Sequence, residues 1–597
     1  MKEFKKLLSF TKGYRGLYLF GIISVITSQF IVILSPLVLR TTIDSIIGDL
    51  EIESVFFLRA VNALGGREDL RDNLYKIGLI IISIALLRGV FLYIKNTLSS
   101  QAAERIVENI KNDLYDHIQR LPYKYHVKAE TGDLIQRCTS DVETIRKFLA
   151  IQVMEVIGSI FMLLFIFIVM LSINPTLAFI SVALLPITFI FSIYFFKKIK
   201  TNFTASDEAE AALTSTLQEN IIGVRVVKAF SRQKHEIENF DEKNKTYMKL
   251  TNKLVLNLSY YWALSDLLNI TQIGLVIVVG SFFAVRGVIS IGTLFTFTTY
   301  INMLVWPIRQ MGRTLTDMGK AFVSIKRIEE ILNEPIEDLA PTGVQNPIKG
   351  ILEFNNLSFS YEDGKDVLRN ISFKIKQGQT AAFIGPTGSG KSTLISLIDR
   401  LYDYERGSIT LDGQELNSID RNWVRRNIGL ILQETFLYAK TIRENIRLSN
   451  PQLPDKNVVS AAKSSFIHDD ILEFKEGYET LVGERGVSLS GGQKQRMAIA
   501  RTLIRDLPII IFDDSLSAVD STTDREIRSS LKSRNEKSTT IVISHRISTV
   551  SEADIIFVLD KGQIVQRGTH KELIGEEGLY KRVFQAQSSY DDKVIAN

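Results

Sequence analysis

Six long apolar stretches recur in the first half of the chain and restrict what that half can fold into. A helix rises about 1.5 Å per residue, so about 20 apolar residues cross the hydrocarbon core of a bilayer. Stretches of this kind are Leu17–Leu39, Ile77–Ile94, Val153–Ile173, Leu177–Phe196, Leu264–Val285 and Ile289–Trp306. Soluble core helices are usually shorter and keep a polar stripe. We therefore predict six transmembrane helices, with a turn at Asn174-Pro175-Thr176 between the third and fourth.

The distribution of basic residues predicts the orientation of these helices. Cytoplasmic segments carry an excess of lysine and arginine. Such residues cluster before the first stretch and after the fourth, at Lys2, Lys5, Lys6, Lys12, Arg15, Lys197, Lys198 and Lys200. The loop between the third and fourth stretches carries no charge. We predict a multi-pass protein of the cell membrane with both chain ends in the cytoplasm.

Ionisable residues at membrane depth indicate a pathway or pocket by default. Arg88, Glu155 and Asp266 fall in or near the predicted spans. For Glu155 and Asp266 the competing interpretation is a helix end in the membrane interface. Two charged cytoplasmic stretches, 96–152 and 197–261, keep helical periodicity and are expected to project from the membrane as helices.

Composition changes in the second half of the chain. Residues 333–350 contain several Pro and Gly residues, which is typical of a linker, and short β-type runs then alternate with helical ones. We predict an α-helical membrane domain over 1–332, a linker over 333–350 and an α/β domain over 351–590. The single cysteine, Cys138, excludes an internal disulfide, and the net charge of +5 on 597 residues is too diffuse to indicate nucleic-acid binding.

A phosphate-binding loop is the strongest motif of the α/β half. Residues 385–393 read GPTGSGKST, follow the apolar run Thr380–Ile384 and precede the helical run Leu394–Ile398. This strand–loop–helix context is the one that G-x-x-x-x-G-K-[ST] requires. Backbone N–H groups of such a loop surround phosphate oxygens at a helix N-terminus. The residues predicted to hold the nucleotide are Gly385, Thr387, Gly388, Ser389, Gly390, Lys391, Ser392 and Thr393.

Two further segments extend this prediction. The apolar run Ile509–Phe512 ends in Asp513-Asp514, and a strand that ends in aspartate beside a phosphate loop suits Mg²⁺ coordination. Ser392 and Asp513 are therefore predicted metal ligands. Between the two motifs lies Leu489-Ser490-Gly491-Gly492-Gln493.

With these motifs in this order, the chain resembles a half-transporter of the ATP-binding cassette (ABC) exporters, a six-helix membrane domain fused to one nucleotide-binding domain. The resemblance implies a P-loop ABC fold, a type I exporter-like bundle, and ATP and Mg²⁺ as cofactors. It identifies Leu489–Gln493 as the family signature sequence and implies a dimer in which each signature sequence faces the partner's phosphate loop. It implies that Ser490, Gly491, Gly492 and Gln493 contact ATP in this way.

The same resemblance assigns further roles to single residues. It implies that Tyr361 stacks on adenine, that Gln433 contacts Mg²⁺ and water, and that His545 senses the γ-phosphate. Asp520 would lie on the loop that crosses between cassettes, and Glu484 on a segment that meets the membrane domain. The regions 121–135 and 223–230 resemble the segments that couple the two domains.

Asp514 departs from the family pattern, in which glutamate at this position polarises the attacking water. Aspartate is one methylene shorter, and a misplacement of about 1 Å can cost on the order of 10²-fold in rate. The chain thus resembles the degenerate-site subunit of heterodimeric bacterial multidrug exporters. This resemblance predicts a different half-transporter as partner and slow hydrolysis at the chain's own site.

Other interpretations stay open. A homodimer with slow hydrolysis and an ATP-gated channel or regulator fit the same motifs. Aromatic residues in the sixth stretch (Phe295, Phe297, Tyr300 and Trp306) fit amphipathic drugs or lipids as substrates, although such a stripe is more often helix packing.

Overall fold

The computed structural model describes residues 13–52, 54–337, 343, 345–362, 364–483, 486, 489–515, 519, 521–534 and 538–595. The chain divides into two compact units. One consists of Met1–Gln119 and Ala129–Glu334, and the other of Arg120–Lys128 and Pro335–Asn597. The short segment Arg120–Lys128 therefore belongs structurally to the unit that contains the phosphate loop.

The first unit is helical. Its long elements are α2 (Arg15–Thr41), α5 (Tyr75–Arg120), α9 (Val153–Ile173), α11 (Leu185–Ile222), α13 (Gln233–Val285) and α14 (Ile291–Leu332). The short ones are α3 (Val55–Ala63), α4 (Gly66–Asp72), α7 (Thr131–Gln136), α8 (Val142–Lys147), α10 (Pro175–Val182) and α12 (Val224–Ala229), with π-helical turns at Thr42–Ile47, Arg137–Asp141 and Phe148–Gln152. Within the described residues, six helical stretches are long and apolar enough to cross a membrane, as predicted.

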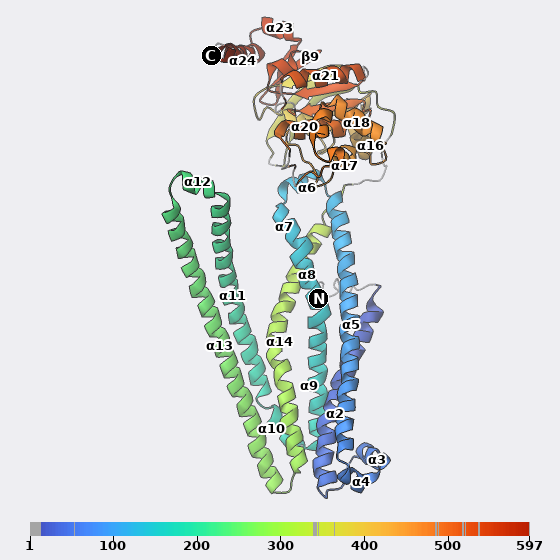
Figure 1. The fold of residues 1–597 in the computed structure, drawn as a ribbon, viewed down its shortest axis with the longest axis vertical. Coiled ribbons are helices and arrows are strands. Elements are labelled where there is room, and N and C mark those ends of the chain that lie inside the picture. The colour runs from blue at the N-terminus through green and yellow to red at the C-terminus, as the bar shows by residue number, and fades with distance from the viewer. Residues whose placement is uncertain are drawn as a thin grey trace. The chain divides into compact units, whose positions relative to one another are not determined.

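The expected turn between the third and fourth spans is present. Helix α9 ends at Ile173, and the side chain of Asn174 accepts a hydrogen bond from Leu177 N at 2.9 Å to cap α10. Helices α11 and α13 lie side by side and are joined through α12, so the charged stretch 197–261 is indeed helical (Figure 1).

The core of the membrane unit explains part of the aromatic stripe on α14. Phe297 and Tyr300 are fully buried, with Ile166 of α9 and Val276 of α13 in the same apolar cluster. The Tyr300 hydroxyl donates a hydrogen bond to the carbonyl of Ile33 at 2.8 Å. These two rings are therefore packing residues. Phe295 and Trp306, by contrast, are 44% and 60% exposed.

The second unit contains two sheets. Its strands are β1 (Leu352–Ser360), β2 (Asp366–Ile375), β3 (Thr380–Ile384), β4 (Arg406–Leu411), β5 (Gln414–Glu415), β6 (Ile428–Ile431), β7 (Ile509–Asp513), β8 (Thr539–Ile543), β9 (Ile555–Asp560) and β10 (Gln563–Gly568). The order β2-β1-β4-β5 forms an antiparallel sheet, and β10-β9-β3-β8-β7-β6 forms a sheet that is parallel apart from β10.

Helices surround these sheets. They are α6 (Tyr123–Lys128), α15 (Lys391–Ile398), α16 (Arg421–Asn427), α17 (Ile442–Arg447), α18 (Asp455–Ser464), α19 (His468–Glu473), α20 (Gly491–Leu503), α21 (Ser521–Arg534), α22 (Ile547–Val550), α23 (His570–Gly575) and α24 (Leu579–Ile595). The predicted linker 333–350 falls between the end of α14 and the start of β1.

Strand register places the segments that follow β3, β7 and β8 at one edge of the parallel sheet, where the carboxyl ends of these strands meet. Ile543 of β8 pairs with Phe383 of β3 on one side and with Asp513 of β7 on the other. The three strands therefore end at the same level. In open α/β sheets, ligands bind beyond the carboxyl ends of the strands.

The aromatic core beneath this edge fixes β3. Phe383 is fully buried, and its ring centroid lies 5.4 Å from that of Phe373 and 5.1 Å from that of Phe557. Replacing a buried Phe with Ala typically costs about 3–5 kcal/mol, because the lost contacts leave a cavity.

Phe383→Ala is therefore expected to lower the melting temperature of the α/β unit clearly in thermal unfolding of the full chain. Val565→Ala on β10 serves as the control, because Val565 is 50% exposed and its truncation should change stability by less than about 0.5 kcal/mol. Equal shifts for the two variants would contradict the assignment of Phe383 to the core.

Candidate nucleotide-binding site

The phosphate loop lies between β3 and α15 and depends on glycine at two places. A Cβ on Gly385 would lie 2.0 Å from the carbonyl oxygen of Leu559. Gly390 has φ +101°, in the left-handed region that favours glycine, and a Cβ there would lie 2.6 Å from the Leu368 side chain. Both positions exclude larger residues, and the loop backbone is held close to its neighbours.

Lys391 occupies the centre of this loop. Its side chain is buried, and Nζ donates hydrogen bonds to the carbonyls of Gly385 and Pro386 at 2.9 Å each. Burial lowers the pKa of the ammonium group, while the carboxylates of Asp513 and Asp514 oppose that shift. A buried cation of this kind gains from an incoming anion, so the loop fits a phosphate.

Asp513 at the end of β7 meets the loop. Burial raises the pKa of its carboxyl group, and neighbouring Asp514 adds to the rise. Lys391, a hydrogen bond from Ser392 and His545 act in the opposite direction. The structure thus brings these predicted residues together.

A carboxylate beside a serine hydroxyl is a donor set that suits Mg²⁺, which is typically held by one or two carboxylates, phosphates and water. Among the described residues no group of three or more His, Cys, Asp and Glu side chains could hold a metal by itself. Ser392 and Asp513 therefore fit an ion that is shared with nucleotide phosphates.

Asp514 and His545 border the same edge. Asp514 has φ +45°, its N–H donates to the carbonyl of Ile543 at 2.9 Å, and its Oδ1 accepts from Ser544 Oγ at 3.4 Å. His545 lies two residues after the end of β8 and is exposed. A carboxylate and an imidazole thus lie at the same end of the parallel sheet as the phosphate loop.

Tyr361 lies beside the other end of the loop. Its hydroxyl is 3.0 Å from Thr393 Oγ1, and its ring meets Tyr402 edge-to-face with centroids 5.2 Å apart. Tyr402 in turn meets Tyr123 of α6 at 5.8 Å. The sequence did not identify Tyr402, because no local motif marks a tyrosine that follows the helix after the loop.

The signature segment, Leu489–Gln493, lies in a different part of the α/β unit from the phosphate loop. Ser490 caps α20 reciprocally with Gln493: Gln493 N donates to Ser490 Oγ at 3.3 Å, and Ser490 N donates to Gln493 Oε1 at 3.1 Å. Gln493 Nε2 also donates to Asp470 at 3.0 Å. Leu489 belongs to an apolar cluster separate from the one that contains Phe383.

Three other predicted residues have less structural support. Gln433 is exposed on the loop after β6, whose last residue, Ile431, pairs with Phe512 of β7. Gln433 thus lies near the same sheet edge as the end of β7. Asp520 and Glu484 lie outside the residues that the structure describes.

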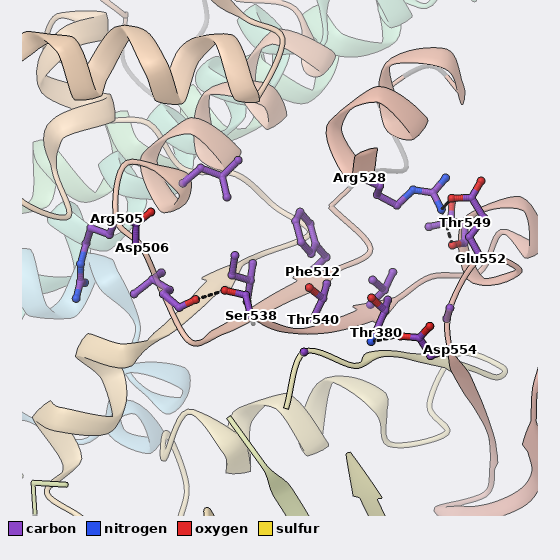
Figure 2. Close-up of a pocket in the computed structure, with 16 residues that line it drawn as sticks. Thr380, Arg505, Asp506, Phe512, Arg528, Ser538, Thr540, Thr549, Glu552 and Asp554 are labelled. Atoms are coloured by element: carbon purple, nitrogen blue, oxygen red, sulfur yellow. Dashed lines mark hydrogen bonds and ion pairs between the residues drawn. The ribbon is translucent and has the colours of Figure 1, made fainter. Parts of the chain in front are cut away.

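A cavity of about 350 Å³ lies at the other ends of the strands (Figure 2). Thr380, the first residue of β3, contributes to its lining, whereas the phosphate loop follows the last residue of β3. Its charged residues have partners: Arg528 pairs with Glu552 at 3.2 Å, and Asp554 accepts from Thr380 N at 2.7 Å. This cavity is separate from the nucleotide site.

One ionisable residue of the membrane unit has an unexpected partner. Asp266 forms an ion pair with Arg309 of α14, which is buried and also donates to Ser265 Oγ at 2.5 Å. The sequence did not mark Arg309 as a residue of the membrane core, because it follows the predicted end of the sixth span at Trp306. Arg88 has a buried Nε without a hydrogen-bond partner among the described residues.

Comparison with known proteins agrees with this architecture. Residues 18–308 match the family model of the ABC transporter transmembrane region, and residues 368–517 match that of the ABC transporter. The chain is 32% identical over 593 residues to the ATP-binding/permease protein YgaD of Bacillus subtilis, which is named for multidrug export, covering 98% of this chain and 100% of YgaD. A similarly named Staphylococcus aureus protein is also 32% identical, over 591 residues, with 98% and 100% covered.

The fold has a solved counterpart. A bacterial Atm1-family ABC exporter, determined with ATP bound, superimposes with a TM-score of 0.80 at 23% identity, covering 96% of this chain and 99% of that one. An ABC-type α/β domain with a phosphate loop, fused to six apolar helices, defines an ATP-driven membrane transporter. The chain belongs to the ABC transporter family, with an exporter-type fold, and it binds and hydrolyses ATP with Mg²⁺.

Lys391→Ala is expected to remove most of the thermal stabilisation that Mg·ATP gives the full chain, because the buried cation facing the phosphates is lost. A ligand at 100 times its Kd stabilises by about 2.7 kcal/mol. Lys374→Ala, at a lysine on β2 whose side chain is 57% exposed, is the control and should keep the shift. An undiminished shift in Lys391→Ala would contradict the assigned role.

Proposed function

We propose that the chain is one half of an exporter that moves amphipathic small molecules, drugs or lipids, outward across the cell membrane. The observation that carries this proposal is the presence of six apolar helices and an ABC cassette on one chain. The names of the relatives favour multidrug export. Exposed Phe295 and Trp306 on α14 offer apolar contact surface for such substrates.

Each motif then has a role in ATP binding. Lys391 binds the β- and γ-phosphates, Tyr361 stacks on adenine, and His545 contacts the γ-phosphate. Bound Mg²⁺ neutralises charge on the phosphates, and Ser392, Asp513 and Gln433 are the residues that would hold it. Asp520 would contribute from the loop that crosses to the partner cassette.

The site needs a second half-transporter. Ser490, Gly491, Gly492 and Gln493 would complete the partner's nucleotide site. In support, Leu489 packs in a different apolar cluster from Phe383 and Leu394, which lie before and after the chain's own phosphate loop. The tip around α12 supports the same arrangement. Ile222, Val226 and Phe230 are 76%, 60% and 72% exposed, which leaves an apolar surface for the partner's cassette to cover.

A matching surface occurs on the α/β unit. Leu432 and Phe436, on either side of Gln433 and Glu434, are 52% and 53% exposed. We propose that the partner's α12 tip binds here, so that movement of its membrane helices reaches the loop that carries Gln433. Membrane and cassette domains would then be coupled across the dimer.

Asp514 makes the two nucleotide sites unequal in this proposal. Its carboxylate stands where the family has glutamate, and its shorter side chain would hold the attacking water less well. The chain's own site would therefore retain ATP, whereas the partner, with glutamate at the matching position, would hydrolyse it faster. The partner is accordingly a different half-transporter.

Purification of the tagged full chain from its native membrane tests this assembly. We expect a second ABC half-transporter, with glutamate at the position of Asp514, in a one-to-one ratio. Asp514→Glu in that complex should raise ATP turnover, since a carboxylate displaced by about 1 Å can cost about 10²-fold at its site. Asp514→Asn is the control and should not raise it. Robust ATP-driven transport by the chain alone would instead establish a homodimer.

The orientation can be measured with single cysteines, because Cys138 is the only native one. In a Cys138→Ser background, Asn62→Cys on exposed α3 should react with an impermeant maleimide in intact cells. Lys475→Cys in the α/β unit should react only after permeabilisation. The reverse pattern would contradict the cytoplasmic placement of the nucleotide site.

A further inference from the structure

The C-terminal helix holds the loop that carries His545. Gln587 of α24 donates a hydrogen bond from Nε2 to the carbonyl of His545 at 2.7 Å. Its Oε1 accepts a hydrogen bond from the backbone N–H of Ile547 at 2.9 Å. Both halves of one side-chain amide are thus used on the backbone at either side of Arg546, in the manner of a neighbouring strand.

Helix α24 is itself anchored to the parallel sheet. Tyr580 is fully buried in an apolar cluster with Ala382 and Ile384, the residues of β3 that lead into the phosphate loop. The backbone N–H of Tyr580 donates to Gln566 Oε1 at 3.1 Å, and its hydroxyl lies 2.6 Å from His570 Nδ1. The helix therefore gives Gln587 a fixed base relative to the phosphate loop.

The space between α24, the phosphate loop and the loop that carries His545 contains a cavity. A cavity of about 220 Å³ is bordered by Gly385, Pro386, His545, Val583 and Gln587. Apolar packing from this side holds Tyr580 and Ile547 in one cluster, whereas the His545 side chain is exposed and lies outside that cluster. The two hydrogen bonds of Gln587 are thus a specific restraint on the backbone from which the imidazole projects.

We propose that Gln587 is a positioning residue that sets the direction of His545 towards the γ-phosphate. The proposal rests on the proposed role of His545 as the γ-phosphate contact. Loss of the Gln587 amide would let the His545 backbone turn away from the phosphate loop. Because ADP lacks the γ-phosphate, the preference for ATP over ADP would fall, while the contacts of Lys391 and Tyr361 would persist.

The chemistry of the amide makes the proposal specific. Gln587→Glu keeps an acceptor for Ile547 N–H but cannot donate to the His545 carbonyl, and it places a negative oxygen against that carbonyl. Gln587→Ala removes both bonds. Gln585, two residues earlier on α24, is exposed, and Gln585→Ala is a matched control with the same helix and the same residue type.

The experiment measures equilibrium binding of Mg·ATP and Mg·ADP to the full chain, in the oligomeric form in which it purifies. Wild type, Gln587→Ala, Gln587→Glu, Gln585→Ala and His545→Ala are compared, and thermal unfolding checks that each is folded. A hydrogen bond contributes a net of about 1 kcal/mol, so we expect Gln587→Ala to weaken ATP binding about three- to tenfold with ADP binding unchanged. Gln587→Glu should match or exceed this loss, and Gln585→Ala should show none.

Two results would overturn the inference. Equal weakening of ATP and ADP binding in Gln587→Ala would mean that α24 only stabilises the cassette. Unchanged ATP binding in Gln587→Ala, with reduced ATP binding in His545→Ala, would refute the positioning role and leave the proposed function intact. If His545→Ala itself left the ATP preference unchanged, the assigned role of His545 would fail, and the inference with it.

Discussion

The backbone register of three parallel strands is the constraint on which the nucleotide site depends. Ile543 pairs with both Phe383 and Asp513, and Asp514 N–H continues the pattern by donating to the Ile543 carbonyl at 2.9 Å. A slip of one residue in either pairing would turn every side chain of the shifted strand to the opposite face of the sheet. The phosphate loop, the magnesium-type carboxylate and the His545 loop are distant in sequence, and this register alone brings them to one edge.

Electrostatics then defines what the edge can bind. Lys391, Asp513 and Asp514 are gathered in a partly buried site, and burial disfavours the charged form of Lys391 and of Asp513. Lys391 neutralises part of the acidic charge, but its ammonium group donates two hydrogen bonds to carbonyls of its own loop. A polyphosphate with a divalent cation offers each group an opposite charge, which explains why anion and metal are expected to bind together.

Local sequence patterns predicted the residues whose roles depend on neighbours along the chain. Lys391 and Ser392 belong to a contiguous phosphate-loop motif after an apolar strand, and the six spans are marked by uninterrupted apolar runs, so both could be identified without a structure. Tyr402, Arg309 and Gln587 could not, because their partners lie far away in sequence or outside any motif. Arg309, for example, meets Asp266 across 43 positions. The aromatic stripe on α14 shows the same limit, since periodicity cannot tell which rings pack against other helices.

At Asp514, the local sequence pattern and the three-dimensional structure both contribute to the interpretation. Its position is fixed by the N–H bond to Ile543 and by φ +45°, a left-handed conformation that aspartate tolerates better than most residues. Because the strand register sets this backbone, the main chain has little freedom to advance the carboxylate towards a bound nucleotide. The carboxylate oxygens of Asp514 are therefore set back by one methylene relative to those of a glutamate at this position. One of these oxygens already accepts a hydrogen bond from Ser544. The asymmetry proposed for the dimer thus follows from a rigid backbone combined with a short side chain.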